Sequence, residues 1–208
     1  GAWLRGNLHT HTHHSDGERP RQDVIDDYAR RGYGFLMISD HDIYTGSKEY
    51  SELDSKGMIL IPGNEVTARG PHMLHVNADR RIEPYAQRQR VINEVNASQG
   101  FLVANHPNWT KRFNHCPIEK LDEWVGYAGI EIYNGVISRL DGSPYATNKW
   151  DMLLNDCRPI WGFANDDSHA AENDVELGWN VAYVTDRSVA GVVDALTKGR
   201  FYCSTGVN

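Results

Sequence analysis

The 208-residue sequence has few of the features that mark membrane, disulfide-rich or nucleic-acid-binding proteins. Its three cysteines, Cys116, Cys157 and Cys203, include no CxxC pair, so neither a disulfide framework nor a zinc knuckle is expected. No run of about 18 apolar residues is present, so no membrane-spanning helix is predicted. A net charge of −7 argues against a long nucleic-acid partner, which would need a basic track.

Common targeting and phosphate-binding motifs are also missing. The opening GAWLRGNLH has no apolar signal-peptide segment, which favours a cytoplasmic protein, or an exported one whose signal has been removed. There is no GxGxxG or GxxxxGK[ST] loop and no GxSxG nucleophile elbow. The 40% hydrophobic and 24% charged residues fit one globular domain over residues 1–208, and the closing RFYCSTGVN could lead into further chain.

Extended apolar segments alternate with helical ones along the chain. Strands are predicted over 4–11, 34–42, 58–68, 72–78, 101–107, 129–135, 159–169 and 180–186. Helices are predicted over 19–33, 46–57, 84–100, 118–127, 143–157 and 188–199. Runs such as FLMIS and FLVAN are typical of parallel strands covered on both faces. We therefore expect an α/β fold, and the number of repeats favours a barrel over an open sheet.

Histidine is the residue that the sequence concentrates. The stretch NLHTHTHHSDG, residues 7–17, holds four histidines, of which His9, His11 and His13 share one face of an extended backbone. Three imidazoles make a poor core, because buried polar nitrogens must be satisfied. They are good ligands for zinc and related metals, so the stretch predicts a metal site.

Further candidate ligands stand at or just beyond the ends of later strands. They are Asp16, Asp40, His41, Glu65, His72, His75, His106, Glu131, Asp166, Asp167 and His169. Taken singly, each has an ordinary interpretation as a cap, turn or surface residue, and His13 and His115 are expected at the surface. In a barrel of parallel strands, however, the C-terminal ends share one rim, where active sites are built from several strands. The joint pattern therefore predicts one metal centre.

The ordered motifs resemble those of the PHP family, the polymerase and histidinol phosphatase domains. HTHHSDG, SDHD, PGNEVT, HVN, NHP and the closing DSH follow the family's order across essentially the whole chain. The resemblance implies a distorted seven-stranded (β/α) barrel with its metal site at the C-terminal rim of the strands. It also implies two or three divalent metal ions, which could be Zn, Mn or Fe.

The same resemblance implies the ligands. One metal would be held by His9, His11, Glu65 and Asp167. A second, bridged by Glu65, would be held by His75 and His106, with His72 as a competitor for the place of His75. A third would be held by Asp16, His41 and His169.

A metal-dependent phosphoesterase that cleaves a small-molecule phosphate ester is the function that this resemblance implies. Two cations would share a hydroxide that attacks the ester, with Glu65 as their bridge. His169, or water at the third metal, would supply the proton to the leaving alcohol. Arg19 would contact a phosphate oxygen, unless it is simply an exposed arginine at the start of a helix.

Other functions remain open at this point. The alternatives are a metal-dependent nuclease on short oligonucleotides, a carbohydrate or amide hydrolase on a similar barrel, and a non-catalytic structural domain. The short segment between His75 and His106 leaves no room for a large cap, so we expect an open site whose specificity comes from loops 107–117 and 136–146. The substrate and the oligomeric state do not follow from the sequence.

Overall fold

The computed structural model describes residues 1–111, 114–170 and 172–206. Its strands are β1 Ala2–Asn7, β2 Phe35–Leu36, β3 Ile59–Leu60, β4 Gly63–Val66, β5 Met73–Val76, β6 Phe101–Ala104, β7 Gly129–Asn134, β8 Trp161–Asn165, β9 Trp179–Val184 and β10 Phe201–Ser204. Its helices are α1 Arg21–Arg30, α2 Ser47–Tyr50, α3 Arg88–Asn96, α4 Ile118–Glu123, α5 Thr147–Asn155 and α6 Val189–Thr197, with a 3-10 turn, η1, at Val136–Arg139.

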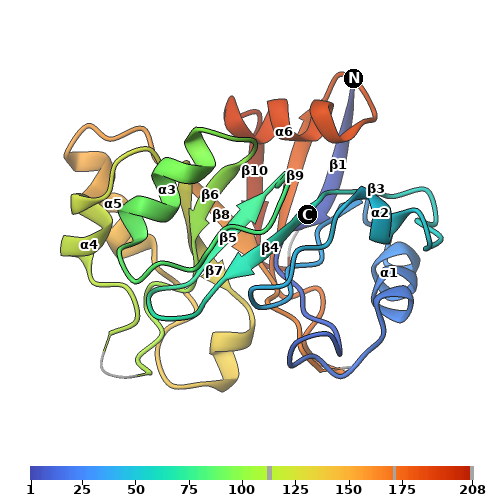
Figure 1. The fold of residues 1–208 in the computed structure, drawn as a ribbon, viewed down its shortest axis with the longest axis horizontal. Coiled ribbons are helices and arrows are strands. Elements are labelled where there is room, and N and C mark those ends of the chain that lie inside the picture. Colours follow the sequence, from blue (N-terminus) through green and yellow to red (C-terminus); the bar gives the residue numbers. More distant parts are fainter. Residues whose placement is uncertain (112–113, 171, 207–208) are drawn as a thin grey trace.

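The strands form two five-stranded sheets that face each other (Figure 1). The first has the order β10-β9-β1-β2-β3 and the second β4-β5-β6-β7-β8. In β6, Phe101 and Val103 point into the core between the sheets, whereas Leu102 and Ala104 point outward at helices. Both faces of this strand are covered, which explains why its sequence is continuously apolar.

Helices cover the outer faces of both sheets. α3, α4 and α5 pack on the second sheet, and α1 packs on the first (Figure 1). α6 contributes Val192, Ala195 and Leu196 to the core between the sheets, at the end where β1 begins. The opposite end of that core is left to polar side chains. Among the described residues, no helix combines the length and apolar character that a membrane span requires.

The expected α/β class is confirmed, but the described strands do not pair into a closed seven-stranded (β/α) barrel. At the polar end, the sheets meet through isolated bridges, such as Thr10 with Ser168. Beyond β1 the backbone leaves its ladder, and the N–H groups of Thr10 and Thr12 donate to the Ser39 hydroxyl and the Asp40 carboxylate. Side chains thus satisfy some backbone groups there, while the Thr10 carbonyl still accepts from the Ser39 N–H and the His11 N–H still donates to the Ser168 carbonyl, so only isolated bridges join the two sheets.

Strand direction also differs from the expected all-parallel arrangement. β5 runs antiparallel to both β4 and β6, and β9 runs antiparallel to β1 and β10. β1–β2 and β6–β7–β8 are parallel. Because β5 is reversed, its first residue, rather than its last, lies at the polar end of the sheets.

Candidate metal centre

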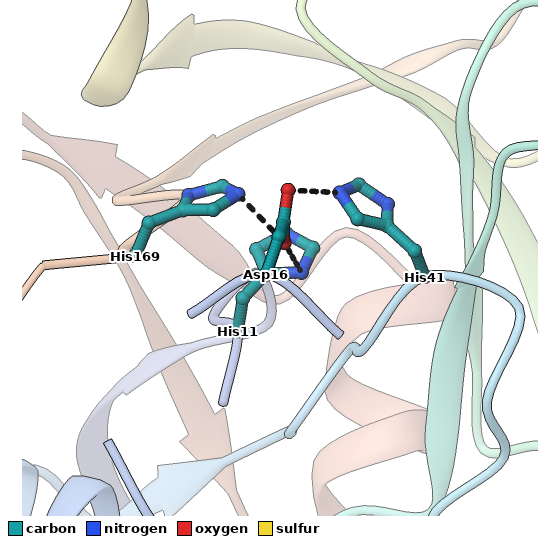
Figure 2. Close-up of side chains that lie close together, drawn as sticks. All are labelled: His11, Asp16, His41 and His169. Atoms are coloured by element: carbon teal, nitrogen blue, oxygen red, sulfur yellow. Dashed lines mark ion pairs between the residues drawn. The ribbon is translucent and has the colours of Figure 1, made fainter. Parts of the chain in front are cut away.

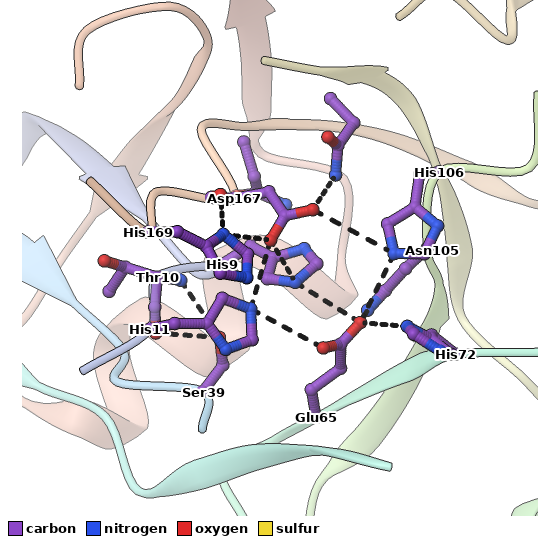
Figure 3. Close-up of polar contacts among 12 residues, drawn as sticks. His9, Thr10, His11, Ser39, Glu65, His72, Asn105, His106, Asp167 and His169 are labelled. Atoms are coloured by element: carbon purple, nitrogen blue, oxygen red, sulfur yellow. Dashed lines mark hydrogen bonds and ion pairs between the residues drawn. The ribbon is translucent and has the colours of Figure 1, made fainter. Parts of the chain in front are cut away.

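Histidine and carboxylate side chains from both sheets converge at this polar end (Figure 3). His9 and His11 come just after β1, on alternate positions of an extended segment, and their rings lie 5.2 Å apart. The segment is fixed on both sides, because the His11 N–H donates to the Ser168 carbonyl and Asn7 Nδ2 donates to the His9 carbonyl. The alternation predicted from the sequence therefore does place both rings on one side.

Glu65 of β4 lies at the middle of the cluster and is fully buried. Its Oε1 lies 3.3 Å from His9 Nε2, 3.2 Å from His72 Nδ1 and 3.4 Å from His106 Nε2. Its Oε2 lies 2.7 Å from His41 Nδ1. The two oxygens of one carboxylate thus face different groups of imidazoles.

Asp167 follows β8 and closes the buried side of the cluster. Its Oδ1 lies 3.1 Å from His9 Nε2 and 3.0 Å from His11 Nε2, and Asn134 donates to its Oδ2. Asp167 has φ +57°, and His106 has φ +28°. Side chains other than glycine are strained in this region, and such strain persists only where the surrounding structure holds the residue in place.

A second group, closer to solvent, surrounds Asp16 (Figure 2). The Asp16 oxygens lie 3.3 Å from His169 Nε2, 3.3 Å from His41 Nε2 and 3.8 Å from His11 Nδ1. The Asp16 side chain is 55% exposed, whereas that of His11 is buried. His11 therefore stands between the buried and the exposed groups.

These residues fit the binding of divalent cations. Several buried atoms that face one another have no partner in hydrogen-bond geometry: His9 Nε2, His11 Nε2, Glu65 Oε2 and Asp167 Oδ1. Such atoms are costly unless something satisfies them. The ligand atoms form sets of three or four within 4.8 Å of one another, and mixed imidazole and carboxylate donors suit zinc, manganese or iron.

The pKa shifts of the buried residues around Glu65 also fit the binding of cations. Burial lowers the pKa of His9, but the carboxylates of Asp167, Glu131 and Glu65 outweigh it and hold that pKa well above its ordinary value. Burial raises the pKa of Glu65, but His9 and His41 hold it well below its usual range. The carboxylates therefore remain ionised and require positive charge beside them.

The exposed group is organised by the same forces. Burial opposes the charge of His41, but Glu65 and Asp16 raise its pKa to about 11. Burial likewise opposes the charge of His169, but Asp16 and Asp167 raise its pKa to about 9. Here too, the carboxylates favour the protonated form of the neighbouring imidazoles.

The structure brings eight of the nine expected ligands together: His9, His11, Asp16, His41, Glu65, His106, Asp167 and His169. The exception is His75, whose Nε2 lies 2.9 Å from the Gln99 carbonyl oxygen. His75 pairs with Asn64, on the face of the sheet opposite to Glu65. Because β5 is reversed, His72 reaches the cluster in its place, which corrects the expectation for His75.

Arg19 is not brought to the cluster either. Its guanidinium lies 2.8 Å from Asp27 of α1, and its side chain is only 12% exposed. It is therefore neither an exposed helix-leading arginine nor positioned to contact a substrate at these histidines. The expectation of a substrate contact is corrected to a structural ion pair.

A cavity of about 360 Å³ opens directly over the cluster. Its walls include the expected rim loops, which supply Trp109 and Lys111 on one side and Arg139 on the other. Asp174 holds Arg139 at 2.7 Å, although half of the arginine side chain remains exposed. No motif singled out these residues in the sequence; only the positions of the two loops were foreseen.

His115 was expected at the surface, but its ring packs against His72 and His106 at 4.6 Å from each. The His72 backbone N–H donates to His115 Nε2, and burial together with the neighbouring His106 and His72 lowers the pKa of His115 to about 2. The ring is therefore neutral, with its proton on Nδ1. In this form it offers a hydrogen-bond donor, and its ring also stands with His72 and His106 in a group whose ligand atoms lie within 4.8 Å of one another.

A second cavity of about 430 Å³ adjoins the first and shares His72, Trp109 and Lys111 with it. Arg69, which forms an ion pair with Glu83, and His115 also line it, and no carboxylate among the described residues lines it. The open site thus continues into a neutral to basic groove.

Comparisons with known proteins identify the fold. No protein-family model and no curated sequence matches this chain. Its structure is similar to a two-domain protein from Bacteroides vulgatus that contains a predicted PHP-like metal-dependent phosphoesterase, with a TM-score of 0.75 and 18% identity. The match covers 98% of this chain but only 65% of that one, less than two thirds of its length.

Two further structures share the fold. One is a candidate metal-dependent phosphoesterase from Bifidobacterium adolescentis, with a TM-score of 0.61 and 16% identity over 79% of this chain and 87% of that one. The other is an amidohydrolase from Chromobacterium violaceum with bound sulfate and no metal, with a TM-score of 0.61 and 13% identity over 98% of both. The chain therefore has a PHP-like fold, which confirms the expected resemblance.

Proposed function

We propose that the protein is a metal-dependent phosphoesterase acting on a small-molecule phosphate ester. The observation that carries this proposal is the position of Glu65, whose two oxygens face different imidazole groups directly beneath an open cavity. A carboxylate in this position is suited to join two cations. The cationic side chains of Lys111 and Arg139 line the same cavity and suit an anionic substrate.

Three sets of ligands follow from the contacts. One cation would be held by His9, His11, Glu65 and Asp167. A second would be held by Glu65, His72 and His106, and a third by Asp16, His41 and His169. When bound, such cations lower the pKa of coordinated water and neutralise the charge that develops on phosphoryl oxygens.

The remaining roles belong to the side chains. Arg139, oriented by Asp174, and Lys111 would bind phosphoryl oxygens and hold the ester over Glu65. His169 Nδ1 lies 2.8 Å from the Asp167 carbonyl oxygen, so its free nitrogen is Nε2, which faces Asp16. A ligand role for Nε2 leaves no nitrogen for proton transfer, so we assign His169 to cation binding and the leaving-group proton to solvent in the open cavity.

The test is hydrolysis of a panel of phosphate monoesters by protein reconstituted with Mn²⁺ or Zn²⁺, compared with the same protein after chelation. We expect release of phosphate that depends on the cation. The kcat/KM of this release should fall at least tenfold when Lys111 and Arg139 are replaced by alanine. Cation-independent release, or none from any ester, would contradict the proposal.

A nuclease acting on short oligonucleotides is the second candidate, and the adjoining cavity favours it. That groove carries Lys111, and also Arg69 in an ion pair with Glu83, and could accept the nucleotide next to the cleaved bond. Much faster hydrolysis of a mononucleotide than of a dinucleotide would favour the monoesterase, and much faster hydrolysis of the dinucleotide would favour the nuclease. If an amide added to the panel were cleaved instead, the activity would be that of an amidohydrolase, as named for the Chromobacterium violaceum protein of the same fold.

A further inference from the structure

Glu131 is a buried carboxylate that none of the proposed ligand sets uses. It lies on β7, has no solvent exposure, and places its Oε1 2.7 Å from His9 Nδ1. The other nitrogen of that ring, Nε2, faces Glu65 and Asp167. Because a carboxylate accepts hydrogen bonds and donates none, the proton of this bond resides on His9 Nδ1.

Three more donors fix Glu131 in one orientation. Asn165 Nδ2 donates to Oε1 at 2.9 Å, while the His106 backbone N–H and Asn134 Nδ2 each donate to Oε2 at 2.8 Å. His106 is one of the two ligands with positive φ, so this bond also holds a strained backbone. One side chain thus positions the ring of His9 and the main chain of His106.

We propose that Glu131 is a positioning residue that keeps the proton of the His9 ring on Nδ1 and leaves Nε2 free to bind a cation. The inference rests on the proposed metal-dependent function and extends it to a residue outside the ligand sets. Carboxylates that accept a hydrogen bond from a ligating histidine fix its tautomer and ring orientation.

The substitution Glu131→Gln tests this sharply, because the neighbouring donors dictate how the new amide must lie. The His106 backbone N–H can only donate, so the glutamine oxygen must take the place of Oε2. Asn165 cannot turn over to compensate, since its Oδ1 accepts from the Leu8 N–H and from Asn180. The glutamine NH₂ therefore faces His9 Nδ1, which becomes an acceptor and moves the ring proton to Nε2.

The experiment combines nitrogen-15 NMR of the histidine rings with Zn²⁺ binding by competition against a chromophoric chelator. In the wild-type protein, with and without zinc, we expect a protected His9 Nδ1–H signal, identified by its loss in His9→Asn. In zinc-free Glu131→Gln, at a pH where the His9 ring is neutral, this signal should disappear, and the Zn²⁺ dissociation constant should rise about 10–100-fold.

The matched control is Asp27→Asn, which removes another buried carboxylate, on α1, whose partners are arginines. It should lower stability without moving the His9 signal or the affinity for Zn²⁺. A wild-type His9 without a proton on Nδ1 overturns the inference, even if Glu131→Gln fails to fold. So does a folded Glu131→Gln that retains the signal and binds Zn²⁺ within twofold of wild type. If wild-type protein shows the signal but binds no cation, the proposed function fails while the hydrogen bond stands.

Discussion

The two halves of the ligand cluster are built differently. His9 and Glu65 are fully buried, and Glu65 also accepts a hydrogen bond from Asn105 at 2.6 Å. In the outer half, the side chains of His41 and His169 are 26% and 22% exposed, and that of Asp16 is 55% exposed. Asp16 is placed mainly by the imidazoles that it contacts.

This difference shows how one site can hold cations tightly in its buried half and exchange them more readily in its outer half. Buried ligands held by further hydrogen bonds keep their geometry without a cation, so a cation bound there loses little energy to reorganisation. Ligands that are partly exposed to water and contact mainly one another must become ordered when a cation binds. We therefore expect the buried half to bind cations more tightly than the outer half.

The largest effect is expected from Glu65→Ala, which removes the carboxylate proposed to join the first and second cations. Phosphoesterase kcat should fall by about 10³-fold or more, because both cations lose a ligand at once. Metal content, measured by inductively coupled plasma mass spectrometry, should fall by more than one equivalent per chain. Retention of full metal content and activity would remove Glu65 from the centre of the site.

A smaller and more selective effect is expected from Asp16→Asn. The outer cation should be lost, while those held by His9, His11 and Asp167 remain, so metal content should fall by about one equivalent. Activity should decrease about 10–100-fold, less than for Glu65→Ala. Loss of all cations from Asp16→Asn would show that the two halves bind as one unit.

The metal-free protein should lose stability as the pH rises. The pKa of His169 is about 9 and that of His41 about 11, both above the ordinary 6.5. Their contribution is therefore fully present below pH 6.5 and is lost as the pH rises through 9 and then 11. Calorimetry should show an unfolding temperature several degrees lower at pH 9 than at pH 6.5. Zinc-loaded protein, in which these rings bind as neutral ligands, should show a smaller decrease.

The smallest effect is expected from His75→Gln. His75 contacts Gln99 on the far face of β5, so metal content and kcat/KM should remain within about twofold of wild type. His72→Gln is its matched counterpart and should weaken cation binding about 10–100-fold, because His72 Nδ1 faces Glu65. The reverse ranking would restore His75 as the ligand.

Much of the site could be predicted because its signals are local. His9 and His11 alternate on one extended segment, and Glu65, His106 and Asp167 each stand at or beyond the end of a strand. The segment HMLHVNA has a histidine at each end of a short strand, and only the direction of β5 decides which reaches the cluster. That direction depends on pairing with β4 and β6, which no local pattern records.

The parts that could not be predicted depend on long-range contacts. Lys111 and Arg139 lie in loops without periodicity, and Arg139 is positioned by Asp174, 35 residues away in the chain. Closure of the barrel was expected from the number of strands. It depends instead on how far pairing continues beyond the strand ends: the Thr10 N–H bonds to the Ser39 hydroxyl, and Thr10 forms only an isolated bridge with Ser168.

The positive φ angles of His106 and Asp167 have a consequence for selection and engineering. Glycine adopts such backbone without strain, whereas another residue there costs about 1–3 kcal/mol. Glycine at either position would relieve this backbone cost but would also remove a buried side chain with its contacts and a proposed ligand. A library selected for stability should therefore be screened in the presence of the cation, so that the ligands are retained.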